Sequence, residues 1–93
     1  MDKEIIKRSG LRQTYQPEKI AAALRKVFAQ TEHPFDDVLL NRLIEKVESA
    51  LQTHDVWSVE LIQDLVERAL MESGCYDEAK SYILYRQKRT ELR

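Results

Sequence analysis

Apolar side chains recur at helical spacing along four successive stretches of this chain. In the first stretch, Leu24, Val27 and Phe28 follow Ile20 at intervals of four, seven and eight residues, which places them on one face of a helix. The apolar positions of the later stretches are Leu40, Leu43, Ile44, Val47 and Leu51; Leu61, Ile62, Leu65, Val66, Ala69 and Leu70; and Ala79, Tyr82 and Ile83. Because a helix with one apolar face has to bury it against another element, the pattern predicts a core of four packed helices.

Residues that begin and end helices separate these stretches. Pro17 fits the first position of a helix, where its missing N–H is not needed. Asp36 and Ser58 are placed to begin the second and third helices, and Gly74 is suited to ending the third. The predicted helices therefore cover about residues 17–31, 36–53, 58–73 and 77–91.

The chain begins with two short β-prone runs. Ile5–Arg8 and Leu11–Tyr15 are separated by Ser9–Gly10, and a two-residue connection that ends in glycine is typical of a β-hairpin. We therefore expect a hairpin over about residues 3–15. The predicted fold class is α+β, mostly α: a small N-terminal β-hairpin packed on a four-helix bundle-like core, with residues 1–93 forming a single domain.

The composition excludes several classes of protein. The chain is 43% hydrophobic and 33% charged and has only two Gly and two Pro, unlike collagen-like or mostly disordered chains. No run approaches the roughly 18 to 20 apolar residues of a membrane span, and the first residues lack a secretory leader. Cys75 is the only cysteine, which excludes a disulfide framework and a cysteine-based zinc site. We therefore expect a soluble, cytoplasmic protein.

The net charge of −1 conceals an uneven distribution of charge. Residues 1–26 hold seven Lys or Arg against three Asp or Glu, and residues 80–93 hold five against one. The intervening residues 27–79 hold three against twelve. If the fold brings the two basic ends together, they form one cationic face suited to phosphate. The alternative is that these cations only keep the chain soluble.

The residue types that usually carry catalysis are present without a catalytic arrangement. His33 and His54 lie far apart in predicted loops with no spacing typical of a metal site, so no protein-bound metal is expected. Cys75 follows a helix end with no base arranged beside it, which favours a buried or idle thiol over a nucleophile. The familiar glycine-rich phosphate loops are also absent. The chain is therefore not expected to be an enzyme on its own.

Three cations are predicted to gather near one helix N-terminus. Lys7 and Arg8 lie at the turn of the hairpin, and Lys19 rises from the first turn of the helix that follows. Because the free N–H groups of a helix N-terminus also attract anions, this arrangement suits a polyphosphate. The alternative is a Lys-Arg turn that is simply solvated.

Four segments follow one another in a specific order. They are Lys-Arg-x-Gly at residues 7–10, Tyr-x-Pro-Glu-Lys-Ile at 15–20, Ser-Val-Glu-Leu-Ile-Gln-Asp-Leu-Val-Glu at 58–67 and Tyr-Ile-Leu-Tyr-Arg-Gln-Lys-Arg at 82–89. Each segment alone is a weak signal, but their order and spacing together are quite specific. Over about residues 3–90 the chain resembles the ATP-cone domain.

The resemblance implies an allosteric module. ATP-cones occur mostly at the N-terminus of ribonucleotide reductase catalytic subunits, where they bind ATP or dATP and set overall activity, commonly through the oligomeric state. The expected ligand is thus ATP or dATP, with Mg²⁺ held by the phosphates, and the expected partners are the reductase catalytic domain or subunits and a second copy of the chain. A repressor of the reductase genes also contains a cone, but a cysteine zinc ribbon precedes it, which Cys75 alone cannot form. A chain that stops in a charged helix at Arg93 is expected to be a module excised from a longer protein.

The resemblance also implies a nucleotide site shared by the hairpin and three helices. By position it assigns to this site Ile5, Lys7, Arg8 and Gln13 of the hairpin, Gln16 and Lys19 at the first helix, Ser58 and Gln63 of the third helix, and Lys88 and Arg89 of the fourth. The sequence departs from the family at Ser9, where Asp is usual. Gln16 replaces a frequent Asp or Asn and is a poorer helix cap than either.

Two other functions remain open alternatives. A DNA- or RNA-binding module would use the basic ends, but the acidic middle would repel a long phosphate backbone and no aromatic-basic interleaving marks a base-reading surface. Nucleic acid is therefore not the expected partner, and neither is a membrane. A degenerate cone could instead act as a protein–protein interaction module without binding nucleotide. For Trp57, packing in the core or in an interface is favoured over stacking on a base.

Overall fold

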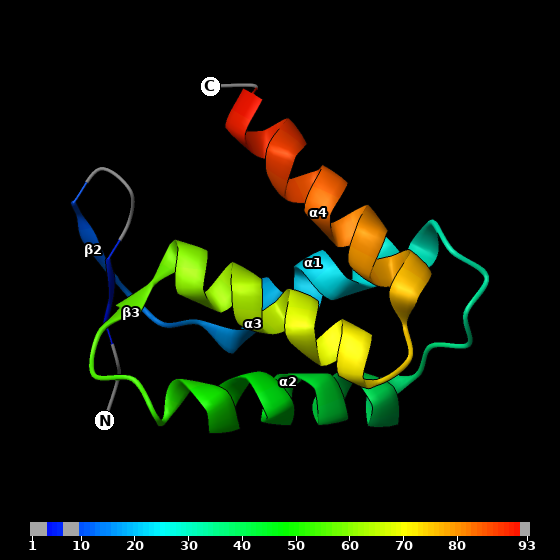
Figure 1. Ribbon diagram of the computed structural model, residues 1–93, viewed down its shortest axis with the longest axis horizontal. Helices are drawn as coiled ribbons and strands as arrows, with labels where there is room; N and C mark the ends of the chain where they lie inside the picture. Colours follow the sequence, from blue (N-terminus) through cyan, green and yellow to red (C-terminus); the bar gives the residue numbers. More distant parts are fainter. Residues whose placement is uncertain (1–3, 7–9, 92–93) are drawn as a thin grey trace.

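The computed structural model describes residues 4–6 and 10–91, with side chains as far as Arg86, and shows four helices and a small sheet. The elements in chain order are β1 (Glu4–Ile6), β2 (Arg12–Thr14), α1 (Pro17–Ala29), α2 (Asp37–Leu51), β3 (Trp57–Ser58), α3 (Val59–Glu72) and α4 (Tyr76–Glu91). This confirms the predicted fold class, α+β with mostly α. Figure 1 shows the sheet at one end of the molecule and the helices packed beside it.

The four helices pack around a common core. α2 and α3 run antiparallel to each other, and α4 crosses obliquely above α3 (Figure 1). α3 packs against both α2 and α4, and α1 fills the remaining side against α4 and α2. The buried residues of α1 are Ile20, Leu24, Val27 and Phe28, the four that helical spacing predicts. The apolar faces of the sequence are therefore the faces that meet in the core.

The ends of the helices follow from local chemistry. The Asp36 carboxylate accepts a hydrogen bond from the Leu39 N–H at 2.9 Å, and the Ser58 hydroxyl oxygen accepts one from the Leu61 N–H at 3.0 Å. Each side chain satisfies an N–H group that the first turn of a helix leaves without a partner. Gln16 stands at the same position before α1 but makes no side-chain cap, as expected of glutamine.

Gly74 ends α3 with a positive φ of 78°. Its N–H bonds to the Met71 carbonyl at 3.1 Å, and the Cys75 N–H bonds to the Leu70 carbonyl at 2.8 Å. These are the two hydrogen bonds typical of a helix that ends in a left-handed glycine. The chain consequently turns back at Gly74 and begins α4 directly at Tyr76.

The sheet contains a third strand that the sequence did not predict. Its order is β2-β1-β3, with β1 antiparallel to β2 and parallel to β3. β3 has only two residues, so it carries no alternation that a periodicity argument could detect. Its partner lies more than fifty residues earlier in the chain, because Ile5 pairs with Trp57.

The hairpin register also differs from the prediction. A two-residue connection at Ser9–Gly10 would pair Ile6 with Gln13, whereas the structure pairs Ile6 with Arg12 and Ile5 with Gln13. The observed register keeps Ile5 on the core side, where its side chain is buried, and a shift of one residue would reverse the two faces of a strand. Gly10 has a φ of 87°, so the left-handed glycine expected near the turn is present.

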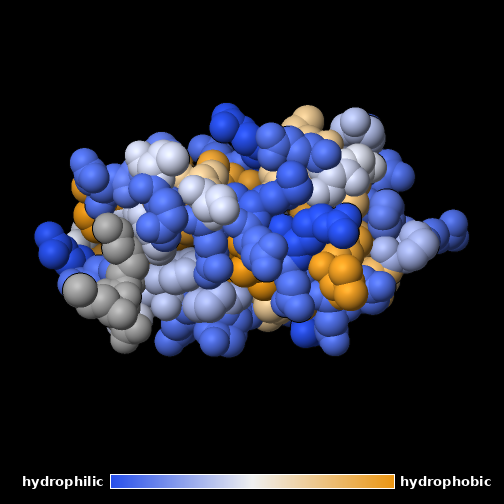
Figure 2. Space-filling model, turned by 90° about the horizontal axis from the view of Figure 1, so that it is seen from below, coloured by the Kyte–Doolittle hydropathy of each residue, from blue (hydrophilic) through white to orange (hydrophobic). Residues whose placement is uncertain are grey.

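The face of the molecule that carries α2 is mostly polar (Figure 2). Seen from the side of α2, it shows predominantly hydrophilic residues with small, separate apolar patches (Figure 2). Among the described residues, none of the helices has the length and apolar content needed to cross a membrane.

Candidate functional site

The sheet brings together three of the residues that the sequence assigns to nucleotide binding. β1 lies in the middle, so Ile5 is next to Gln13 on one side, and Ile6 is next to Ser58 on the other. Gln13 and Ser58 are both partly buried, whereas Ile5 is a core residue with 5% exposure. Because paired residues share a face of the sheet, Gln13 lies on the face of Ile5, whereas Ser58, which pairs with Ile6, lies on the other face.

Two helix N-termini lie at the same end of the molecule as the sheet. Figure 1 shows the beginnings of α1 and α3 there, below the last turns of α4. Gln16 precedes α1, and the Lys19 N–H bonds to the Gln16 carbonyl at 3.0 Å in its first turn. Both side chains are exposed, and no carboxylate in the described ranges pairs with the Lys19 ammonium. An exposed cation at a helix N-terminus favours an anionic ligand.

Four predicted cations cannot be placed by their side chains. Lys7 and Arg8 lie outside the described residues, in the connection between β1 and β2. Lys88 and Arg89 lie in α4, and their side chains are outside the described part. In Figure 1 the end of α4 rises on the side of the molecule that carries the hairpin. That these four cations contact phosphate stays a prediction.

The sequence assigns Ser58 and Gln63 to the third helix, but Ser58 belongs to β3 and directly precedes α3. Ser58 uses one lone pair of its oxygen to cap the helix, so its O–H and its second lone pair remain available to a ligand. Gln63 lies in the second turn of α3 and is partly buried. A role for Ser58 in binding would thus be combined with its role at the helix N-terminus.

An ion-pair network lies between α3 and α4 before the basic end of α4. The Arg86 guanidinium is 3.3 Å from the Asp64 carboxylate and 3.0 Å from the Glu67 carboxylate. Arg86 is therefore already neutralised within the fold. Arg86 thereby links α4 to α3.

Two aromatic residues that the sequence did not assign to the site hold the sheet in place. The Tyr15 hydroxyl donates to the Glu48 carboxylate of α2 at 2.9 Å, and the Tyr15 ring meets the Trp57 ring edge-on at 5.2 Å between centroids. The Trp57 Nε1–H donates to the Leu51 and His54 carbonyls at 3.0 and 3.2 Å. Trp57 is 5% exposed, which confirms core packing and excludes stacking on a base. The sequence feature that could have pointed to the role of Tyr15 is the Tyr-x-Pro segment at residues 15–17.

The pH dependence of the free energy of unfolding tests whether Tyr15 anchors the sheet. Burial raises the pKa of Tyr15 well above the ordinary value of 10.0, and the hydrogen bond to Glu48 and the charge of Glu48 raise it further. Because the folded-state pKa is the higher one, the resulting stability is present below about pH 10 and is lost as the pH rises through the folded-state pKa. Tyr15→Phe should lower the free energy of unfolding at pH 7 by about 1 kcal/mol and make its decline above pH 10 shallower.

Urea unfolding at pH 7 and at pH 10.5 measures both effects. Some alkaline loss of stability should persist in Tyr15→Phe, because burial raises the pKa of Tyr82 to about 12. Tyr76→Phe is the matched control, since the Tyr76 side chain is 62% exposed. Equal alkaline slopes in the wild type and in Tyr15→Phe would contradict the assignment.

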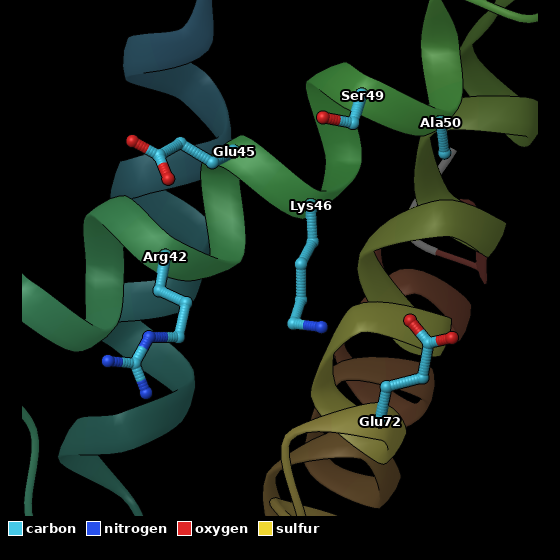
Figure 3. Close-up of a pocket in the computed structure, with 6 residues that line it drawn as sticks. All are labelled: Arg42, Glu45, Lys46, Ser49, Ala50 and Glu72. Atoms are coloured by element: carbon cyan, nitrogen blue, oxygen red, sulfur yellow. The ribbon is translucent and has the colours of Figure 1, made fainter.

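Two hollows on the described surface lie away from the predicted nucleotide residues. An open groove between α2 and the end of α3 is lined by Arg42, Glu45, Lys46, Ser49, Ala50 and Glu72 (Figure 3). Figure 3 shows Lys46 extending from α2 towards the space beside α3, on which Glu72 lies. Two cations and two carboxylates balance each other there, so the groove is poorly suited to a polyphosphate.

The second hollow lies beside Cys75. Cys75 is fully buried, and burial together with the charge of Glu78 raises the pKa of its thiol. A raised pKa disfavours the thiolate that a nucleophile needs, in agreement with the prediction of an unreactive thiol. The expectation that no base lies nearby was wrong, because His33 Nε2 is 3.9 Å from the Cys75 sulfur. The two residues are 42 positions apart, and only the fold brings them together.

Comparison with known proteins decides the family. The model of the ATP cone domain matches residues 3–91. This chain belongs to the ATP-cone family. The match includes the hairpin and all four helices, so the sheet and helix N-termini described above are the architecture of a cone.

The cone is also similar to segments of much longer proteins. It is 40% identical over 100 residues to the ribonucleoside-diphosphate reductase subunit alpha of Chlamydia pneumoniae, covering 96% of this chain and 9% of that protein. It is 38% identical over 99 residues to the vitamin B12-dependent ribonucleoside-diphosphate reductase of Thermoplasma acidophilum, covering 100% of this chain and 13% of that protein. The protein of Treponema pallidum named as a subunit alpha is 38% identical over 96 residues, covering 96% and 11%. The chain thus spans about a tenth of the length of these relatives.

Family membership and these relatives together support a nucleotide-binding, regulatory role for the cone. They also indicate the kind of anion that the site binds, which the charge pattern of the sequence alone left open. The exposed Lys19 and the two helix N-termini favour an anion, and the family specifies that the anion belongs to a nucleotide.

Proposed function

We propose that this cone senses ATP against dATP and regulates the overall activity of a ribonucleotide reductase through its oligomeric state. One observation carries the proposal: β1 joins the hairpin to the N-terminus of α3, at the end of the molecule where α1 also begins. A triphosphate bound there contacts three elements at once and so changes how they are held together. The cone itself carries no catalysis in this proposal.

The predicted site distributes its residues according to their chemistry. Lys7, Arg8, Lys19, Lys88 and Arg89 meet the phosphates and the Mg²⁺ that the phosphates carry. Gln13, Gln16, Ser58 and Gln63 supply polar contacts for the ribose and base. ATP and dATP differ by one 2′-hydroxyl, so a polar side chain near the ribose has to distinguish them.

Regulation requires that the two nucleotides stabilise different states. A ligand that binds two states with equal affinity leaves their ratio unchanged. ATP and dATP therefore have to leave different outer surfaces on the cone, and the oligomeric equilibrium with the reductase catalytic subunits follows that difference. The relatives that this chain resembles are reductases, which is the support for this partner.

Calorimetric titration of the chain with ATP and dATP in the presence of Mg²⁺ tests the proposal. Wild-type chain should bind saturably, and Lys7→Ala combined with Lys19→Ala should weaken binding at least about thirtyfold, because two charge-assisted phosphate contacts are lost. Light scattering on the same samples should show a mass change with dATP that ATP does not produce.

Arg42→Ala combined with Lys46→Ala is the matched control. It removes the same charge from the α2 groove of Figure 3, so it should leave nucleotide binding unchanged. Equal losses in the two double variants would point to general electrostatic attraction rather than to the hairpin site. A folded wild-type chain that binds neither nucleotide would instead be a degenerate cone that acts as a protein–protein interaction module.

A further inference from the structure

Three different metal-binding side chains meet where the connection between α1 and α2 lies against the start of α4. His33 belongs to the connection, Cys75 directly precedes α4, and Glu78 lies in its first turn. One ligand atom from each lies within 4.8 Å of the others. The Cys75 sulfur is 3.9 Å from His33 Nε2, and His33 Nδ1 is 3.7 Å from the Glu78 carboxylate.

The backbone fixes two of these side chains relative to each other. The left-handed Gly74 and the hydrogen bond from the Cys75 N–H to Leu70 hold Cys75 at the start of α4. Glu78 follows three residues later, and the Ala79 N–H bonds to the Cys75 carbonyl at 2.9 Å, so Cys75 and Glu78 share one helical turn. Phe28 meets the His33 ring edge-on at 5.9 Å between centroids, which orients the imidazole from the other side.

The Glu78 side chain is almost entirely buried at the base of a hollow that it helps to line. It is 3% exposed, and the described side chain that it meets is the His33 imidazole, with 3.7 Å between His33 Nδ1 and Glu78 Oε1. Burying a carboxylate costs several kcal/mol unless a cation or hydrogen bonds compensate it. The N-terminus of α4 offers only part of a positive charge. This carboxylate therefore points to a cation at the position between the three side chains.

The cluster is open to solvent on one side. A hollow lined by Glu32, His33, Gly74, Tyr76, Asp77 and Glu78 lies over it, and the His33 side chain is 38% exposed. A metal ion can therefore reach the cluster without unfolding of the core. A water molecule, or a carboxylate from the rim of the hollow, can complete the coordination.

We propose, contrary to what the sequence led us to expect, that His33, Cys75 and Glu78 bind one Zn²⁺ ion, because the fold brings together three ligands that no spacing in the sequence indicates. Thiolate, imidazole and carboxylate are the three protein ligands that zinc takes in tetrahedral sites, whereas Mg²⁺ and Ca²⁺ prefer oxygen alone. Zinc bonds of about 2.0 to 2.3 Å place tetrahedral ligand atoms roughly 3.3 to 3.8 Å apart. The two short distances above involve different nitrogens of the His33 ring, and with one ligand atom from each residue the three atoms lie within 4.8 Å of one another. Zinc binding therefore requires the His33 ring to turn and the ligand atoms to move closer by up to about 1 Å. On binding, the Cys75 thiol releases its proton to solvent and the thiolate coordinates the metal.

This zinc site is independent of the nucleotide site. In Figure 1 the start of α4 and the connection before α2 lie at the opposite end of the molecule from the hairpin. Bound zinc ties that connection to α4 and thereby stabilises the packing of α1, α2 and α4. Loss of nucleotide binding would leave this proposal intact, and loss of zinc binding would leave the proposed function intact.

Titration of the reduced chain with Zn²⁺ against a chromophoric chelator tests the site. One ion should bind per chain and raise the midpoint of thermal unfolding, because a ligand of the folded state stabilises it. Replacing zinc by Co²⁺ should give the d–d bands of a tetrahedral ion and a thiolate-to-cobalt charge-transfer band. His33→Gln should weaken zinc binding at least about tenfold and abolish the rise in the midpoint, since an outer-sphere change alone costs about 10- to 100-fold.

His54→Gln is the matched control, because His54 is the other histidine of the chain and its side chain is exposed. It should bind zinc like the wild type. Glu78→Gln should also weaken binding, and Cys75→Ser should remove the charge-transfer band; circular dichroism shows whether each of these buried variants has folded. His33→Gln keeps the test decisive because its side chain is partly exposed. The site is excluded if the wild type binds no zinc, if His33→Gln binds it as tightly, or if bound Co²⁺ lacks the thiolate band.

Discussion

Trp57→Ala should lower the free energy of unfolding by about 3 to 5 kcal/mol, the range for truncating a large buried aromatic side chain. Trp57 is 5% exposed and meets the Tyr15 ring edge-on. Its indole N–H also satisfies the Leu51 carbonyl at the end of α2, which the variant leaves with one partner fewer. Since domains of this size are stabilised by only about 5 to 15 kcal/mol, the variant should lie close to the limit of folding.

Urea unfolding followed by far-UV circular dichroism measures this effect, because Trp57 is the only tryptophan and its fluorescence is lost in the variant. Val56→Ala is the control, since Val56 is the preceding residue and is 62% exposed. Trp57→Phe keeps much of the volume and should have an intermediate effect. A loss below about 1 kcal/mol in Trp57→Ala would contradict its role as the anchor of the sheet.

The same variant tests the link between fold and function. Trp57 pairs with Ile5 in the parallel ladder, so its loss weakens the attachment of the hairpin to α3. If the proposed nucleotide site is correct, any Trp57→Ala chain that remains folded should also bind ATP more weakly than the wild type. Unchanged affinity in a folded variant would show that the hairpin does not need this attachment to bind nucleotide.

Leu70→Ala should lower the free energy of unfolding by about 2 to 5 kcal/mol. Leu70 is fully buried near the end of α3, and α3 packs against both α2 and α4. Truncation removes apolar contact from the centre of the core and leaves a cavity that rigid helices cannot fill completely. Thermal and urea unfolding of the variant measure the loss.

Met71→Ala is the matched control for Leu70→Ala. Met71 is the next residue of the same helix and is 50% exposed, so its truncation should change stability by less than about 0.5 kcal/mol. Both variants replace a good helix former by alanine, so helix propensity does not account for a difference between them. Similar losses of stability in the two variants would contradict the assignment of Leu70 to the core face of α3 and of Met71 to its exposed face.

The helices could be predicted from the sequence because their determinants are local. Ile20, Leu24, Val27 and Phe28 carry the period of a helix within nine residues, and they are the buried residues of α1. Asp36, Ser58 and Gly74 act through hydrogen bonds and dihedral angles within one turn of their own position. Such signals need no knowledge of the rest of the chain.

The candidate site was predictable only in part. Lys19 could be placed at the start of α1 because Pro17 marks that start, and the structure shows its side chain exposed there. That the ligand is a nucleotide came from the resemblance to a family rather than from charge, which indicates only an anion. The side-chain contacts of the remaining predicted cations stay predictions.

What the sequence by itself determined is therefore each helix, its buried face and its ends to within two residues, because these depend on residues at most a few turns apart. Only the tertiary structure decided the hairpin register, the pairing of Ile5 with Trp57 and the meeting of His33 with Cys75 and Glu78. These contacts join residues that are distant along the chain, and no local pattern encodes them. They form because burying Ile5, Trp57 and Cys75 in one shared core outweighs the entropy lost in closing the loops between them.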